Sequence, residues 1–336
     1  TDRYGTCSVA AYVGPENAPF TVGLRADTDA LPVQEQTDLP FASTIPGQMH
    51  ACGHACHTAM LLGTAKALKE IEGEIDCCVK FLFQSCEEGT AGAKLVCDDG
   101  FMDDVDQIIA CHITSDQPAG VVTIGQDCVN ASSHSFRIHL KGKAAHVARP
   151  HMGVDAIAMA ARIYSDIQIM RAREIDPFQP LVIGIGEIHG GYANNVICDE
   201  VMMHGTVRAL SDETDAKVFR RMEQIVESVS RDMGGSGWIE SYNYTPCVIN
   251  DPGVRDSLRA ASAQVVGSYQ VVERPGSMGA EDFSFYIQHK PGAMFNIGVA
   301  PDPNNIIPLH SGKLVIDEDA LDIAPKIFVQ FIFDNM

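Results

Sequence analysis

A ten-residue segment holds the densest set of side chains that could bind a transition metal. Residues 49–58 read MHACGHACHT and contain three imidazoles and two thiols. Thiolate and imidazole together suit zinc and the late first-row metals near it. Cys52 and His54 lie two residues apart, so in an extended segment both side chains point the same way and can reach one ion. A single Cys-x-His pair is more often a buried thiol beside a helix cap, so other groups must converge on it to make a metal site.

Two carboxylates and a histidine accompany apolar segments that read as buried strands. Glu87 and Glu88 come soon after the segment 78–84, and His112 lies near the end of the segment 108–113. Open α/β sheets place their sites at the carboxyl ends of strands. Adjacent carboxylates point apart, so one can bind a metal while the other accepts a proton from water. Taken singly, the acidic pair reads as a solvated turn and the histidine as a core residue, but their recurrence favours one shared site.

Two weaker signals add to these groups. The segment 25–29, RADTD, follows the apolar residues 21–24, and its carboxylates could bind a metal, orient a metal-bound imidazole or form a turn. His310, in the tripeptide LHS after a Pro- and Asn-rich loop, carries little information alone. The sequence has no GxxxxGK(S/T) phosphate loop, no GxSxG elbow and no HExxH helix, so these common catalytic motifs do not explain its chemistry.

The spacing of apolar residues predicts an α/β fold for the first third of the chain. Strand-like segments at 21–24, 78–84 and 108–113 alternate with a helical pattern over 58–70, for which Thr58 is a suitable N-cap. Such alternation is typical of βαβ units and a mostly parallel sheet. The candidate residues would emerge from the strand ends of this sheet.

A second domain is expected to be inserted in the first. Residues 130–244 show the order β-α-β-β-α-β of a ferredoxin-like sandwich, with Ser211 as the cap of the second helix. Later apolar patterns would complete the first sheet, although Pro325 must interrupt the last helix. The predicted domains are therefore 1–129 with 245–336, and an inserted domain over 130–244.

The composition excludes several classes of partner. The 336 residues include 24 Lys and Arg and 44 Asp and Glu, which gives a formal net charge of −20. Such a surface repels phosphate backbones, so we expect no nucleic-acid partner. No run of about 18 apolar residues occurs, so we expect no membrane partner or span. The odd number of cysteines, 11, favours a reducing cytoplasm over a secreted disulfide framework.

Taken together, seven motifs in order resemble those of the M20 metallopeptidase family. The likeness is closest to its amidohydrolase branch, which includes indole-acetyl-amino-acid hydrolases, hippurate hydrolases and N-acyl-amino-acid deacylases. It spans nearly the whole chain. The motifs are LRADTDALP at 24–32, MHACGHACHTAM at 49–60, FQSCEEG at 83–89, HLKGKAAHVARPHMGVDA at 139–156, NVICDEVMMHGTVRAL at 195–210, GAEDFSFY at 279–286 and LHS at 309–311.

The resemblance implies a fold and a role for each matching residue. The fold would be a mostly parallel-sheet catalytic domain that binds two divalent metal ions, with an inserted ferredoxin-like lid that often dimerises. The ligand set permits zinc, manganese, nickel or cobalt. The implied roles are metal ligation by Cys52, His54, Glu88, His112 and His310, general-base catalysis by Glu87, orientation of a ligand by Asp27, stabilisation of the oxyanion by His146, and substrate contact by Asn195.

The implied reaction is hydrolysis of the amide bond of a small N-acyl amino acid by metal-activated water, with Glu87 as the base. We expect a homodimer through the lid, whose sheet has an edge available for pairing. Arg25 stands where the peptidase branches have a metal-binding histidine, which favours the amidohydrolase branch. Three alternatives stay open: a dipeptidase of the same fold, a non-catalytic metal-binding relative, and an acidic scaffold without metal. The non-catalytic alternative rests on Ala55, because the branch usually has Asp directly after the CGH triplet.

Overall fold

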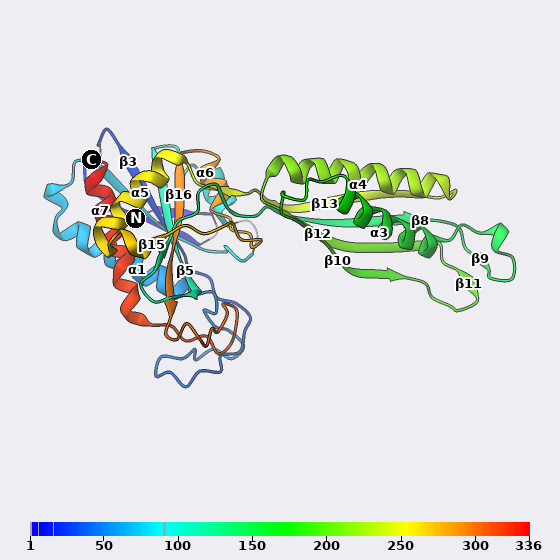
Figure 1. Cartoon of the computed structure of the whole chain (residues 1–336), viewed down its shortest axis with the longest axis horizontal. Helices are drawn as coiled ribbons and strands as arrows, with labels where there is room; N and C mark the ends of the chain where they lie inside the picture. Colours follow the sequence, from blue (N-terminus) through cyan, green and yellow to red (C-terminus); the bar gives the residue numbers. More distant parts are fainter. Residues whose placement is uncertain (1, 6, 16, 90–91) are drawn as a thin grey trace. The chain divides into compact units, whose positions relative to one another are not determined.

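The chain folds into two compact units. The computed structural model describes residues 2–5, 7–15, 17–89 and 92–336. Unit 1 comprises residues 1–129, 248–276 and 282–336, and unit 2 comprises residues 130–247 and 277–281. Figure 1 shows the elements of both units, coloured along the chain. Each unit has its own hydrophobic core.

Unit 1 is built on a mixed sheet, which has eight strands among the described residues. The central pairs β4/β3, β3/β5 and β5/β16 are parallel, whereas β1/β2, β2/β4 and β16/β6 are antiparallel. β3 is buried along its whole length, as expected for a strand that is covered on both faces. The spatial order is β1 (Asp2–Tyr4), β2 (Ser8–Val13), β4 (Cys78–Gln84), β3 (Thr21–Asp27), β5 (Gln107–Pro118), β16 (Gly292–Ala300), β6 (Val122–Thr123) and β15 (Val271–Val272).

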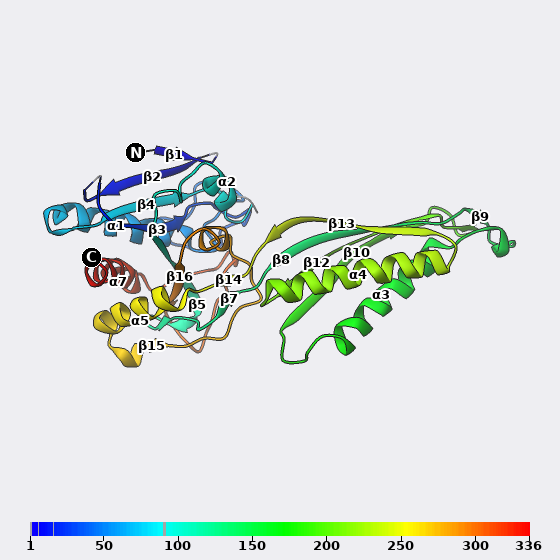
Figure 2. The same ribbon diagram turned by 90° about the horizontal axis from the view of Figure 1, so that it is seen from above.

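Helices cover both faces of this sheet. On one face α1 (His54–Glu70), α5 (Pro252–Val266) and α7 (Ile323–Asp334) share a core with the strands, and α5 and α7 lie side by side (Figure 2). On the other face lie α2 (Gly92–Asp98) and α6 (Ser284–Ile287). The remaining short elements of this unit are the 3-10 helices η1 (Glu72–Glu74), η3 (Ser268–Gln270) and η4 (Glu318–Asp322), and the strand β14 (Val248–Ile249), which pairs with β7 (Cys128–Asn130).

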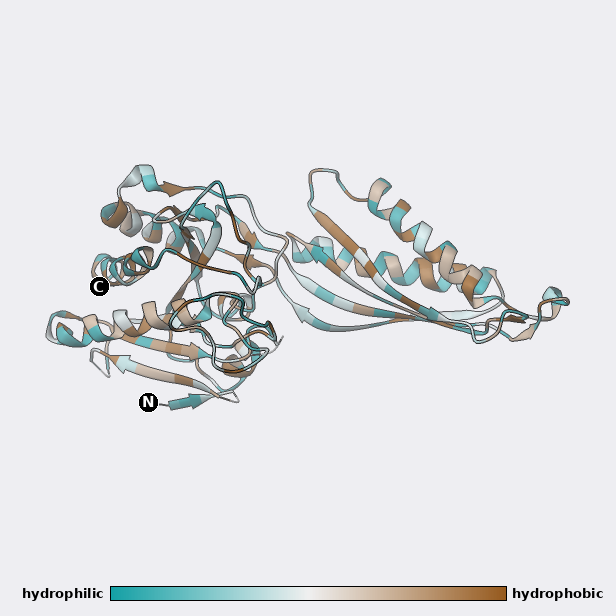
Figure 3. Ribbon diagram, turned by 90° about the horizontal axis from the view of Figure 1, so that it is seen from below, coloured by the Kyte–Doolittle hydropathy of each residue, from teal (hydrophilic) through white to brown (hydrophobic). Residues whose placement is uncertain are grey.

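Unit 2 is an α+β sandwich. Its antiparallel strands lie in the order β10 (Leu181–Gly190), β12 (Glu200–Ala209), β8 (Ser133–Lys141) and β13 (Ser236–Thr245). The helices α3 (Ala156–Arg173) and α4 (Asp212–Asp232) share a core with one face of this sheet. Along β8, buried apolar residues alternate with more exposed polar ones, and Figure 3 shows both hydrophobic and hydrophilic residues on the strands of this sheet. The chain order β8-α3-β10-β12-α4-β13 is the ferredoxin-like order that the sequence predicts.

The predicted fold class is confirmed, and one predicted helix start is wrong. Ser211 caps α4 by accepting the N–H of Thr214 at 3.3 Å, as expected. α1, however, begins at His54, one turn before Thr58, and its N-cap is Gly53 with φ 92°. The Thr58 hydroxyl donates instead to the carbonyl oxygen of Asp27 at 3.3 Å. A left-handed glycine starts this helix without a side-chain cap, so a search for Ser or Thr caps does not find its start.

Two short segments belong to a different unit from the one that their sequence position suggests. Residues 245–247 group with unit 2, and there the backbone N–H of Cys247 donates to Asp212 Oδ1 at 2.9 Å. Residues 277–281 also group with unit 2, where Ala131 N–H donates to the carbonyl oxygen of Ser277 at 2.9 Å. None of the helices formed by the described residues has the length and apolar character that crossing a bilayer requires.

Candidate metal centre

The elements of unit 1 bring the candidate residues to one end of its sheet. β3 ends at Asp27, and α1 begins at His54. Glu87 and Glu88 follow β4 by a few residues, and His112 lies in β5. Since β4, β3 and β5 are parallel neighbours, their carboxyl ends meet at the same edge.

The five expected metal ligands lie close together. Cys52 Sγ is 3.5 Å from His112 Nε2, and Glu88 Oε1 is 3.3 Å from His310 Nε2. Ligand atoms of Cys52, Glu88 and His310 all lie within 4.8 Å of one another. Those of His54, Glu88 and the neighbouring Glu87 satisfy the same limit. Side chains far apart in the sequence thus converge at distances suited to shared metal ions.

Two of these imidazoles are held in the orientation that metal ligands need. His54 Nδ1 lies 3.0 Å from the carbonyl oxygen of Asp29, and His112 Nδ1 lies 2.6 Å from that of Ile113. A carbonyl oxygen only accepts, so each Nδ1 carries the hydrogen and each Nε2 of the neutral ring presents a lone pair. Metal-bound histidines in proteins usually donate their second N–H in this way.

Buried atoms without hydrogen-bond partners mark where a cation would lie. Within the described part of the chain, His54 Nε2 and Glu88 Oε1 are buried and accept no hydrogen bond. Burial and the neighbouring imidazole of His57 lower the pKa of His112 to about 3. Burial opposes charging of His54, but its hydrogen bond to Asp29 and the nearby charge of Asp27 raise its pKa overall. The same carboxylates would stabilise a metal cation beside Nε2, so the residues present fit a metal centre.

Two residues beside the centre adopt left-handed backbone conformations. Cys86, which precedes Glu87, has φ 64°, and His310 has φ 65°. The backbone N–H of His310 donates to the carbonyl oxygen of Ala51 at 2.7 Å, which ties this loop to the segment that carries Cys52. Such conformations cost about 1–3 kcal/mol each and concentrate at functional sites.

His57 and Asp27 form a second layer behind the ligands that the sequence analysis did not resolve. His57 Nδ1 lies 2.5 Å from Asp27 Oδ1, and the backbone N–H of Ile113 donates to His57 Nε2 at 2.9 Å. Both nitrogens of His57 are therefore engaged within the protein. Asp27 Oδ2 lies 3.7 Å from His54 Nε2, whereas the orienting bond of His54 goes to the Asp29 carbonyl. Asp27 therefore bonds His57 directly, and lies farther from the expected ligand His54.

Arg25 holds this second layer and is itself buried. Its guanidinium donates to Asp27 Oδ2 at 2.9 Å, to Gln84 Oε1 at 2.8 Å and to Asp282 Oδ1 at 2.8 Å. Burial opposes ionisation of Asp27, but the hydrogen-bonded imidazole of His57 and the positive charge of Arg25 hold its pKa well below the usual range. Arg25 thus provides a buried positive charge that holds these three acceptors in place.

His146 and Asn195 lie together in unit 2. β9 (Ala145–His146) pairs with β11 (Val196–Ile197), with His146 opposite Val196. The N–H of Val147 donates to the carbonyl oxygen of Asn195 at 2.9 Å, and both candidate side chains belong to exposed residues. This small sheet, followed by the 3-10 helix η2 (Pro150–Met152), therefore presents both residues to solvent.

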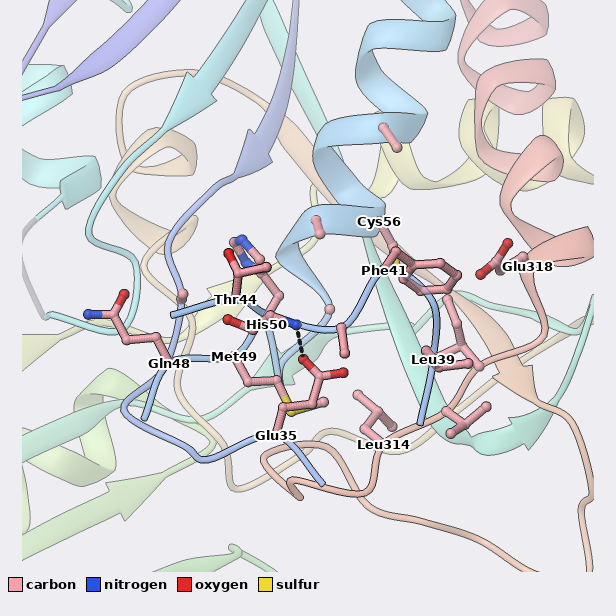
Figure 4. A pocket seen from close by; sticks show the side chains of 18 of the residues that line it. Glu35, Leu39, Phe41, Thr44, Gln48, Met49, His50, Cys56, Leu314 and Glu318 are labelled. Atoms are coloured by element: carbon pink, nitrogen blue, oxygen red, sulfur yellow. Dashed lines mark hydrogen bonds between the residues drawn. The ribbon is translucent and has the colours of Figure 1, made fainter. Parts of the chain in front are cut away.

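A cavity of about 830 Å³ lies beside the first turn of α1 and contains none of the five ligands. Figure 4 shows Cys56, Phe41 and Leu314 among the side chains around it. Ala55 also lines this cavity and is exposed, whereas the adjacent His54 is buried toward the metal ligands. Position 55 therefore faces a cavity that is lined by none of the five expected ligands.

Gly53 gives a testable link between the backbone and the ligands. A Cβ at this position would lie 2.2 Å from Ile113 Cδ1, and its φ of 92° is disfavoured for other residues. We expect Gly53→Ala to lower the free energy of unfolding by about 1–3 kcal/mol or more, because of this clash and the disfavoured φ. The substitution should also weaken metal binding, because Cys52 and His54 flank Gly53. Urea unfolding and metal titration measure both effects. Gly63→Ala, whose Cβ meets only Pro325 Cγ at 3.7 Å, is the control and should stabilise α1 by about 0.5–1 kcal/mol.

Known proteins resemble this chain over nearly its whole length. A model of the peptidase family M20/M25/M40 matches residues 23–334. N-acetylcysteine deacetylase of Bacillus subtilis is 36% identical over 322 residues, which cover 96% of this chain and 83% of the relative. Thermostable carboxypeptidase 1 of Saccharolobus solfataricus is 38% identical over 308 residues, or 90% of this chain and 78% of the relative. A dinuclear metal binding peptidase from the M20 family, of Bacillus subtilis, has a similar structure, with a TM-score of 0.84 and 33% identity over 97% of this chain and 84% of its own.

Proposed function

Because the chain belongs to peptidase family M20/M25/M40, we propose that it hydrolyses the amide bond of N-acyl amino acids with two divalent metal ions. The chain is a metal-dependent hydrolase of amides, like the relatives that it matches. The main support for the proposal is that His54 Nε2 and Glu88 Oε1 are buried without hydrogen bonds and lie close to further possible ligand atoms.

Each residue of the centre has a defined task in this reaction. Five side chains would hold the metal ions: Cys52, His54, Glu88, His112 and His310. When bound, the ions lower the pKa of water and polarise the amide carbonyl. Glu87, whose Oε2 lies 4.0 Å from His54 Nε2, accepts a proton from the attacking water and delivers it to the departing amine.

The lid residues act on the substrate rather than on the metals. We assign to His146 a hydrogen bond to the oxyanion of the tetrahedral intermediate, a contact typically worth about 3–4 kcal/mol. Asn195, held beside it by the β9/β11 pairing, contacts the substrate. Closure of the inserted domain over the substrate would bring both into action.

We also propose a homodimer formed through this domain and a cytoplasmic location, as the sequence indicates.

A second candidate function is cleavage of short peptides. The relative named as a carboxypeptidase is 38% identical to this chain, slightly more than the deacetylase. Both activities use the same metals and base, because each breaks an amide bond next to a carboxylate-bearing residue. The acyl side of the substrate, a simple acid or an amino acid, distinguishes them.

Metal analysis combined with a substrate panel tests the proposal. Protein purified without chelator should contain about two divalent ions per chain, and should release amino acid from N-acetyl and N-benzoyl amino acids faster than from dipeptides. Removal of metal with a chelator should abolish turnover, and re-addition should restore it. Faster release from dipeptides would favour the second function, and full occupancy without turnover on any substrate would favour a non-catalytic relative. Undiminished turnover in metal-free protein would exclude the mechanism.

A further inference from the structure

Asp29 contacts three parts of the candidate metal centre at once. Its Oδ1 accepts the backbone N–H of Glu87 at 3.1 Å, and its Oδ2 accepts that of Glu88 at 3.0 Å. Its own carbonyl oxygen accepts the Nδ1 hydrogen of His54 at 3.0 Å. We propose that Asp29 is a positioning residue that fixes the base Glu87 and the ligand Glu88 relative to His54. This inference rests on the proposed function of the centre.

The segment that carries the two glutamates needs such a support. β4 ends at Gln84, and Cys86 adopts a left-handed backbone conformation, so no strand pairing continues to Glu87 and Glu88. One carboxylate that accepts two consecutive N–H groups fixes both peptide planes. Since side chains of adjacent residues point apart, fixing these planes sets one glutamate toward the water that it deprotonates and the other toward the metal.

The side chain and the backbone of Asp29 act on different parts of the centre. The contact to His54 Nδ1 uses the carbonyl oxygen, although Asp29 Oδ1 also lies 3.4 Å from this nitrogen. A side-chain substitution therefore removes the support of both glutamates while the carbonyl bond to His54 remains.

Variants of Asp29 distinguish a role in positioning Glu87 and Glu88 from a role that only stabilises the loop. In Asp29→Ala we expect Mn²⁺ affinity of the metal-free protein to fall about 10–100-fold, measured from the electron paramagnetic resonance signal of free Mn²⁺. At saturating Mn²⁺, where the loss of affinity no longer matters, we still expect a lower kcat than that of the unaltered protein, because the base is misplaced. KM should change little. Asp29→Asn has nearly the same shape and keeps one acceptor, so its Mn²⁺ affinity and kcat should lie between those of Asp29→Ala and the unaltered protein.

The control is Asp106, whose carboxylate accepts a backbone N–H at the start of β3, whereas Asp29 lies just beyond the end of β3. Asp106 Oδ2 accepts the N–H of Thr21 at 2.8 Å, and Asp106→Asn should leave Mn²⁺ affinity and kcat unchanged. Unaltered Mn²⁺ affinity in both Asp29 variants, with only a lower melting temperature, would overturn the inference. If Asp29→Ala does not fold, the isosteric Asp29→Asn decides the question. The Mn²⁺ titration needs no substrate, so it tests Asp29 even if the proposed substrates are not cleaved.

Discussion

Replacement of Glu87 by Gln is expected to lower kcat by about 10²–10⁴-fold while the bound metal is retained. The amide has the size of the carboxylate but does not accept a proton from water at neutral pH. Glu87 lies near His54 Nε2, and its backbone N–H remains bonded to Asp29, so the substitution leaves the surrounding geometry in place. Metal analysis of the purified variant, together with steady-state kinetics on an N-acetyl amino acid, measures both parts of the prediction.

The neighbouring glutamate provides the matched control for this variant. Glu88→Gln makes the same chemical change one residue away, where Oε1 lies 3.3 Å from His310 Nε2 and is assigned to a metal. This variant should lose metal affinity, and excess metal should restore part of its activity. Turnover by Glu87→Gln close to that of the unaltered enzyme, or a loss of metal from it, would remove the role of Glu87 as base.

Periodicity of apolar residues was sufficient to predict the mostly parallel sheet of unit 1 and the α+β sandwich of unit 2. The strand predicted at 78–84 coincides with β4, and the order of strands and helices in 130–244 is that of unit 2. Both depend on local patterns, since buried parallel strands are continuously apolar and half-exposed antiparallel strands alternate. The start of α1 was misplaced because Gly53 uses backbone conformation rather than a capping side chain, and a glycine in a sequence has many possible reasons.

The candidate ligands could be named from motifs, but their supports could not. His54 and His112 are oriented by the backbone carbonyls of Asp29 and Ile113, and a carbonyl acceptor requires no particular side chain. The second layer joins residues far apart in the chain, such as Arg25 and Asp282. Its only sequence signals are the acidic residues of RADTD and GAEDF, and nothing local indicates that they meet. His57 was visible as an imidazole in MHACGHACHT, although its partner was not.

We expect the largest loss of stability in unit 1 from Arg25→Met, which removes the buried guanidinium. Arg25→Met keeps a long unbranched side chain but leaves Asp27 and Asp282 buried without this cation. Breaking a buried ion pair from one side typically costs about 3–5 kcal/mol, because the remaining charge is uncompensated. Urea unfolding of the metal-free protein measures this loss of stability. Arg259→Met removes a partly exposed arginine 2.9 Å from Glu273 and should cost at most about 1 kcal/mol.

The effect should reach the metal centre because Arg25 and His57 share Asp27. Without the guanidinium the pKa of Asp27 rises, and His57, bonded to both Asp27 and the N–H of Ile113, is less firmly held. Arg25→Lys restores the charge but cannot match the three directed hydrogen bonds of the guanidinium, so its stability should lie between those of Arg25→Met and the unaltered protein. Equal stability of Arg25→Met and Arg259→Met would contradict this account. It would mean that Asp27 and Asp282 are compensated by other groups.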